Sequence, residues 1–305
     1  MIRYPQVVPI ALFGLISMTS SVHAQTLEPR AYANAPVGMN FLLVGYQNST
    51  GALLFDPAIP ITDANADIDM GFLAYVRTLD VAGKSAKAGV ILPYASLYAN
   101  GYLDGDFRTR ETDGIADPAL YFSMNFYGAP AVSLKDFKGY QQDTIIGFTL
   151  KLVPPLGVYE SDKLINIGTN RWTLEPGLGI SKALGKWTLE ASVAADIYTD
   201  NTDFDNGKTR EQDNIYSTQF HVIYSFPRNI WAAVSATYYT GGRTTIEGVS
   251  NDDLQQNWRT GFTLALPVNR YHSIKLFGSS GVSTRTGTNY DSLGIAWQYR
   301  WGGGL

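Results

Sequence analysis

The chain of 305 residues contains no cysteine and only three histidines. Without cysteine, an exported chain gains no stability from disulfide bonds, so its fold must be held by other means. Charged residues are also few, at 16% of the chain, and the formal net charge is −4. A deficit of positive charge argues against a nucleic-acid partner.

Long apolar runs are absent except at the N-terminus. There, Arg3 precedes the apolar stretch Val7 to Met18, and Val22-His23-Ala24 follows as a small-residue cleavage site. This is the pattern of a secretory signal peptide. The stretch is shorter than the roughly 20 residues that a spanning helix needs, so we predict cleavage after Ala24. No later segment offers such a run, which excludes a helical membrane protein.

Apolar and polar residues instead alternate with a period of two. In the last stretch, Leu293, Ile295, Trp297, Tyr299 and Trp301 share one face, with small or polar residues between them. Such alternation predicts a strand with one apolar face. Trp and Tyr near strand ends are typical of the aromatic belts of membrane-spanning barrels. About twelve stretches of this kind recur, each close to the length of a tilted transmembrane strand.

The apolar faces are predicted to contact lipid. On the first two strands they are formed by Val37, Met39, Phe41 and Leu43, and then by Ile68, Met70, Phe72, Ala74 and Val76. The opposite phase is predicted to line the lumen. Its uncharged members favour an amphipathic or aromatic solute: Tyr46, Leu73, Tyr75, Tyr121 and Tyr127.

The connectors alternate between long and short, apart from the long segment Gly128 to Gln142. This predicts an all-β fold, a membrane-spanning antiparallel up-and-down β-barrel of about 12 strands, within about 10 to 14. An even strand number places both termini in the periplasm. We expect a signal peptide (1–24), a periplasmic N-terminal segment (25–36), an outer-membrane β-barrel (37–301) and a short C-terminal tail (302–305).

Charged side chains of both signs occupy the lumen phase, where water makes them less costly than in lipid. We hypothesise that nine of these side chains line the lumen or a constriction in it: Lys151, Arg171, Glu175, Glu190, Asp196, His221, Arg259, Lys275 and Arg300. The connector Gly101 to Asp117 is long enough to be functional. We hypothesise that it is an outer-loop lid over the lumen, with a solvated loop as the alternative; its charges are Asp104, Asp106, Arg108, Arg110, Glu111 and Asp113.

The residues of the sequence give little support for a catalytic site or a metal site. After cleavage only His221 and His272 remain, the first in the lumen phase and the second at a turn, so neither is placed to attack a lipid ester. The loop that starts at Asn201 fails as a calcium loop because Asn206 and Gln212 stand where Gly and Glu are required. We therefore expect no enzyme activity, no metal and no cofactor.

Five stretches together resemble the family named putative MetA-pathway of phenol degradation. They are Leu27 to Tyr32 with Ala35 to Gly38, then Leu92 to Tyr94, Gly114 to Pro118, Asn166 to Trp172, and Trp297 to Trp301. The resemblance implies an outer-membrane barrel that helps small, often aromatic, compounds across. It implies no catalytic residues.

These observations favour passive, selective passage of small amphipathic or aromatic compounds through a narrow polar lumen. The alternative is a structural or surface-interaction barrel with a plugged lumen, and an outer-membrane lipid hydrolase is a third possibility. The expected location is the outer membrane of a Gram-negative bacterium. The expected partners are outer-membrane lipids and lipopolysaccharide, the barrel-assembly machinery, and a small hydrophobic or aromatic solute.

Overall fold

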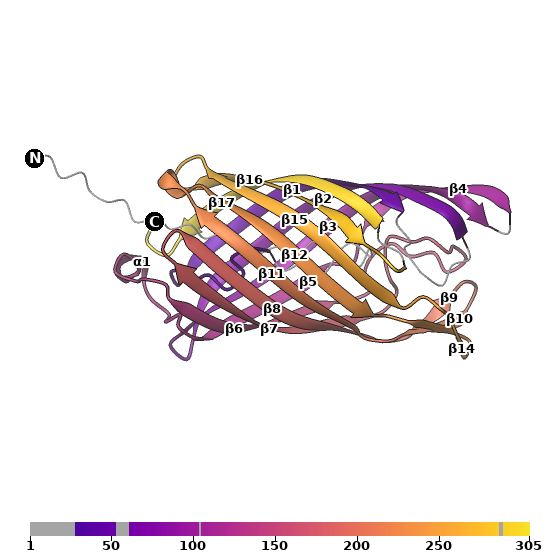
Figure 1. Cartoon of the computed structure of the whole chain (residues 1–305), viewed down its shortest axis with the longest axis horizontal. Helices are drawn as coiled ribbons and strands as arrows, with labels where there is room; N and C mark the ends of the chain where they lie inside the picture. Colours follow the sequence, from indigo (N-terminus) through magenta and orange to yellow (C-terminus); the bar gives the residue numbers. More distant parts are fainter. Residues whose placement is uncertain (1–27, 53–60, 104, 287–288) are drawn as a thin grey trace, which may run out of the picture.

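A computed structural model describes residues 28–52, 61–103, 105–286 and 289–305, and the predicted signal peptide lies outside these ranges. The described part is dominated by long strands that tilt around one axis (Figure 1). The elements are β1 (Met39–Ala52), β2 (Ile61–Val81), β3 (Lys84–Leu103), β4 (Asp106–Ile115), β5 (Ala119–Tyr127), α1 (Leu134–Phe137), β6 (Thr144–Val153), β7 (Thr173–Leu184), β8 (Trp187–Tyr198), β9 (Asn201–Phe204), β10 (Lys208–Gln212), β11 (Ile215–Ser225), η1 (Pro227–Asn229), β12 (Trp231–Gly241), β13 (Thr244–Ile246), β14 (Val249–Ser250), β15 (Gln255–Pro267), β16 (His272–Ser283) and β17 (Asn289–Gly302).

The strands close into an antiparallel barrel, which confirms the predicted fold class. Within the described residues, the ring contains twelve strands, in the order β1, β2, β3, β5, β6, β7, β8, β11, β12, β15, β16 and β17. The ring closes because β17 pairs with β1 along its whole length. Strand β3 is longer than β4 and β5, so its first half pairs with β5 and its second half pairs with β4.

The two ends of the barrel differ as the connector lengths predict. Tight turns and α1 lie at one end, and β4 lies at the other together with a small sheet of β9, β10, β13 and β14 (Figure 1). The turn between β2 and β3 is Ala82-Gly83, and both residues have positive φ, as two-residue hairpins of type I′ require. Among the described residues, no helix is long and apolar enough to cross a membrane.

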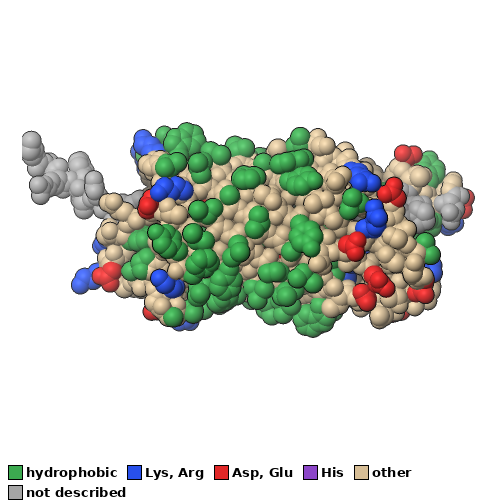
Figure 2. Space-filling model, turned by 60° about the horizontal axis from the view of Figure 1, so that its bottom comes forward, with side chains coloured by type: hydrophobic (Ala, Val, Ile, Leu, Met, Phe, Trp, Pro, Cys, Tyr) green, Lys and Arg blue, Asp and Glu red, His purple; other side chains and the backbone are tan. Residues whose placement is uncertain are grey.

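An apolar band covers the outer face of the barrel wall (Figure 2). From β5 to β17, the side chains predicted to face lipid point outward; Leu178 is 54% exposed and Val234 66% exposed. The closing strand follows the same rule, because Leu293, Ile295 and Trp297 are exposed while Ala296 and Gln298 are buried. Apolar side chains exposed on the outer face of the wall are what a lipid-embedded barrel presents.

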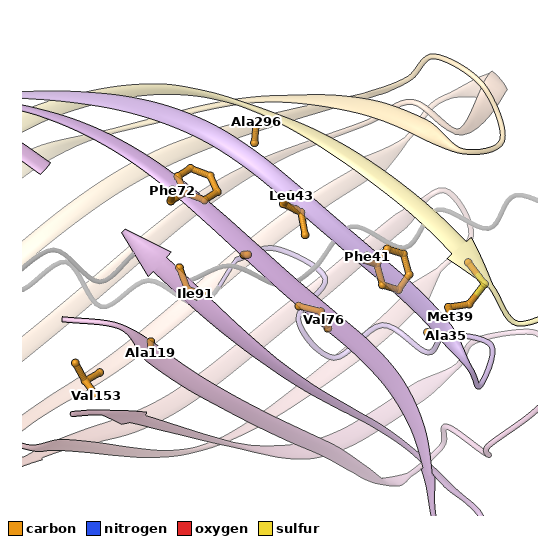
Figure 3. Close-up of a cluster of buried hydrophobic side chains, with 11 residues drawn as sticks. Ala35, Met39, Phe41, Leu43, Phe72, Val76, Ile91, Ala119, Val153 and Ala296 are labelled. Carbon is orange, nitrogen blue, oxygen red and sulfur yellow. The ribbon is translucent and has the colours of Figure 1, made fainter. Parts of the chain in front are cut away.

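The predicted phase is wrong in β1 and β2. Met39, Phe41, Leu43 and the apolar residues from Ile68 to Val76 are buried in the barrel interior, where several of them pack together (Figure 3). Three side chains predicted for the lumen are instead exposed on the outside: Tyr46, Leu73 and Tyr127. In β1 and β2 both phases are rich in apolar residues, so alternation alone cannot choose the lipid face. Tyr127 turns outward at a register shift in β5.

The lipid face can be tested with Leu178, which lies in the middle of β7 between Phe148 and Val193. Leu178→Arg is expected to lower the free energy of unfolding by about 2–4 kcal/mol, because an outward charge must enter hydrocarbon. Denaturant titration of the barrel in lipid vesicles measures this. Leu156→Arg, in the exposed connector after β6, is the matched control. Equal costs at both positions would contradict the outward assignment of β7.

Candidate functional site

One side of the lumen carries two buried apolar clusters. Toward the turn end, Phe41, Leu43, Phe72, Val76 and Ile91 form a buried cluster on β1, β2 and β3 (Figure 3). Toward the loop end, Ile68, Leu97 and Tyr290 belong to a second cluster on β2, β3 and β17. We call the two clusters together the apolar stripe. Its two clusters offer apolar contacts to the non-polar part of a molecule inside the barrel.

The other side of the lumen is polar. Lys151 on β6 and Glu175 on β7 form an ion pair across neighbouring strands, and the Asp196 carboxylate on β8 faces the same pair. On β11, His221 Nδ1 lies 2.7 Å from the Ser235 hydroxyl on β12. Charges inside a narrow barrel need such partners, because an unpaired buried charge is costly. We call this side the polar wall.

Eight of the nine predicted lumen residues are buried inside the barrel. Two arginines are held against aromatic rings: the Arg171 guanidinium lies 4.2 Å from the ring centre of Tyr198, and that of Arg259 lies 3.7 Å from that of Tyr290. Arg300 differs from the others, since it is only half-buried at the turn end and donates to the Arg270 carbonyl oxygen.

The N-terminal segment before β1 lies inside the lumen, which the sequence did not predict. The segment 25–36 was expected in the periplasm, but in its described part, residues 28–36, the side chains from Ala31 to Ala35 are buried. The contacts come from several sides of the ring. Glu28 pairs with Lys275 on β16, the Arg30 amide donates to Glu190 on β8, and Lys87 on β3 donates to the Ala31 carbonyl oxygen. The segment therefore crosses the lumen near its turn end.

Two glycines in the wall make room for this segment. The Tyr32 ring packs so closely that a Cβ added at Gly179 would lie 2.2 Å from it, and one at Gly147 would lie 3.0 Å from it. Asn125 on β5 donates to the Tyr32 carbonyl oxygen over 2.9 Å. Larger residues at either glycine would push the Tyr32 ring out of its position. The fit shows that wall and segment are shaped for each other.

At the loop end, the connector between β6 and β7 folds back onto the barrel. Asp117, in the break between β4 and β5, accepts from the Gly157 amide over 2.7 Å and from the Thr169 amide over 2.8 Å. The Thr169 hydroxyl donates to the same carboxylate, and Ile167 is buried in the loop-end cluster. A Cβ at Gly157 would lie 2.7 Å from the Asp117 nitrogen, so only glycine fits there.

The hypothesised lid takes a different position. Residues 106–115 form β4, which extends the β3 hairpin outward instead of closing the lumen (Figure 1). Asp106 and Arg108 pair with each other in solvent, and Asp104 lies outside the described residues. Glu111 and Asp113 are also on this hairpin. Only Arg110 reaches inward, to Glu160 of the β6–β7 connector. The outer loop whose described residues contact the interior is the third, between β6 and β7, through Ile167.

Asp117→Ala is expected to loosen the β6–β7 connector. Two backbone amides lose their acceptor, which costs about 1–3 kcal/mol locally. Hydrogen exchange of residues 154–172 should become faster, by the factor that this local loss of free energy gives. The barrel strands should keep their protection. Asp106→Ala, whose ion pair is exposed, is the control and should leave exchange unchanged. Unchanged exchange in both variants would contradict the role of Asp117.

The two histidines form no pair on the lipid-facing surface. His221 points into the lumen, and His272 stacks between Trp297 and Tyr299 at the turn end of β16 and β17. Within the described ranges, no group of three or more acidic or histidine side chains could hold a metal ion.

Comparison with known proteins gives one family and several similar structures. Residues 46–299 match the family described as Putative MetA-pathway of phenol degradation. An outer membrane channel from Pseudomonas putida F1 is similar over 90% of this chain and 100% of that chain, with 22% identity and a TM-score of 0.76. The transport unit of the autotransporter AIDA-I from Escherichia coli is similar over 91% of this chain and 94% of that chain, with 11% identity and a TM-score of 0.52. At these identities the likeness shows the barrel fold. No curated protein matches the chain.

Proposed function

The chain belongs to the putative MetA-pathway of phenol degradation family, and we propose that it gives small amphipathic or aromatic compounds passive, selective passage across the outer membrane. The observation that carries this proposal is the two-sided lumen. The apolar stripe runs along β1, β2, β3 and β17, and the polar wall faces it from β6 to β16.

A solute with a ring and one polar group matches both sides at once. Its ring contacts the apolar stripe, while a hydroxyl or carboxylate meets the hydrogen-bonding groups of the polar wall. A sugar lacks the apolar part, and a plain hydrocarbon makes no hydrogen bond to the polar wall. A barrel of twelve strands also has a narrow interior that side chains largely fill. Selective passage is therefore favoured over free diffusion.

The N-terminal segment must move, or the solute must pass beside it. Its polar anchors are side chains of the wall, among them Lys275, Lys87 and Asn125. The same contacts favour the second candidate, a structural barrel whose lumen stays plugged. Conductance separates the two, because a plugged barrel would stay silent.

The location in the cell is inferred from the barrel fold. The barrel lies in the outer membrane, and we propose that a cleaved signal peptide exports the chain, that the assembly machinery reads its closing strand, and that lipopolysaccharide surrounds its loop end. A charged constriction that includes Arg171 stays part of this proposal. The third function, lipid hydrolysis, would need a catalytic group facing lipid; His221 faces the lumen, and His272 is held in a stack with Trp297 and Tyr299.

Flux into proteoliposomes tests the proposal. Vesicles with the folded barrel should take up 4-hydroxybenzoate faster than a pentose of similar size, while vesicles without protein provide the background. Hydrolysis of a labelled phospholipid should stay at background. Equal flux of both solutes would indicate a general pore, and no flux of either would favour the structural barrel.

A further inference from the structure

Three neighbouring turns at the periplasmic end each expose one cation at the tip. Lys186 lies between β7 and β8, Arg228 between β11 and β12, and Arg270 between β15 and β16. Since β8 pairs with β11 and β12 pairs with β15, these turns are consecutive around the rim. We call Lys186, Arg228 and Arg270 the basic rim.

The three turns of the basic rim carry positive charge without an acidic residue of their own. The three turns, 183–188, 225–231 and 267–272, contain no Asp or Glu. Among the described residues, none of the three cations forms an ion pair, whereas Lys182 nearby pairs with Asp143. On the face in Figure 2, acidic side chains gather mainly at the opposite end. An uncompensated positive charge at one end of the barrel attracts an anionic surface.

Aromatic rings lie directly beside these cations. Trp187 contacts Tyr224 at 4.7 Å between ring centres, and Tyr224 contacts Phe226 at 4.7 Å. The guanidinium of Arg270 lies 4.5 Å from the Tyr271 ring centre, next to the stack of His272 and Trp297. Exposed Trp and Tyr rings mark the level of the lipid headgroups. The cations therefore lie at the phosphate level of the periplasmic leaflet.

In the turn between β11 and β12, the arginine has a backbone conformation that is unusual for this residue type. Arg228 has φ 62° and Asn229 has φ 63°. Asn and Gly are favoured at such positions, and arginine is unusual there. A strained position occupied by an exposed charge points to a role for that charge.

We propose that the basic rim binds anionic phospholipids of the periplasmic leaflet, such as phosphatidylglycerol and cardiolipin. Consecutive turns on this rim are two strand spacings, or about 10 Å, apart, so that each cation can meet a different phosphate, while the rings pack against glycerol and the upper acyl chains. This surface lies outside the lumen, so the proposal does not depend on transport.

The test compares two triple variants with the same change in charge. The rim variant is Lys186→Gln, Arg228→Gln and Arg270→Gln. The control is Lys84→Gln, Lys135→Gln and Lys138→Gln, which removes exposed cations at the same end, beside Asp80 and Asp136. Heat-dependent migration in gels verifies that both fold. Native mass spectrometry in detergent then measures cardiolipin binding, with zwitterionic phosphatidylethanolamine, whose net charge is zero, as the reference.

The wild type should prefer cardiolipin, and the rim variant should bind it at least about tenfold more weakly, since each lost charge is worth about fivefold near a membrane surface. The control should change by less than about twofold. Loss of the same size in both variants would overturn the proposal, because net charge alone would then explain binding. A wild type without preference for cardiolipin would overturn it as well.

Discussion

Deletion of residues 28–35 is expected to raise the single-channel conductance of the barrel several-fold. These residues cross the lumen and are buried from Ala31 to Ala35, so their removal opens the turn end of the lumen. The wall then exposes the groups that held the segment, including Lys275, Glu190 and Lys87. Recordings in planar lipid bilayers measure the effect.

The matched control removes eight residues elsewhere. Deletion of residues 105–112 shortens the outward β3–β4 hairpin and should leave conductance within the scatter of the wild type. Equal conductance of the wild type and of the variant without residues 28–35 would show that this segment is not the barrier. A rise caused by the hairpin deletion would restore the lid hypothesis for the second outer loop.

Loss of Lys151 is expected to have the largest effect on stability. Lys151→Met leaves the Glu175 carboxylate without its cation inside the barrel, together with the facing Asp196. Removing one member of a buried ion pair costs about 3–5 kcal/mol, because the remaining charge keeps its desolvation penalty. Unfolding of the barrel by urea in detergent micelles gives the free energy.

A double-mutant cycle makes this test specific. Glu175→Gln alone should cost less than Lys151→Met, since Lys151 retains Asp196 as a neighbour of opposite charge. The double variant should recover part of the loss, because both members of the ion pair are gone, although Asp196 loses the neighbouring cation Lys151. Additive costs in the double variant would contradict the interpretation of the pair as one coupled unit.

Most of the barrel wall could be predicted from the sequence, because its strands separate the two environments clearly. In β7, Leu174, Leu178 and Ile180 alternate with Glu175 and glycines, so a single phase is suited to lipid. In β1 and β2 the neighbours Phe41 and Leu42, or Phe72 and Leu73, are both apolar. Only packing inside the lumen decides which of them faces inward, and no local pattern reports it.

The positions of the N-terminal segment and of the β6–β7 connector also could not be predicted, for a related reason. Residues 28–36 have no periodicity, and their position depends on partners more than 50 residues away, such as Lys87 and Glu190. The contact of Asp117 with Thr169 spans 52 residues. The sequence did offer one signal, because both residues lie in stretches that carry the family resemblance. The resemblance marked the two stretches but gave no reason to join them.

Photo-crosslinking measures most directly whether an aromatic solute uses the two-sided lumen. Folded barrels in vesicles would be incubated with 4-azidobenzoate, irradiated, digested and mapped by mass spectrometry. Our account predicts modified peptides from the apolar stripe, around Phe41, Phe72 and Leu97, with competition by excess 4-hydroxybenzoate. Labelling confined to the outer loops or to the lipid-facing side chains, without competition, would contradict a path through the lumen.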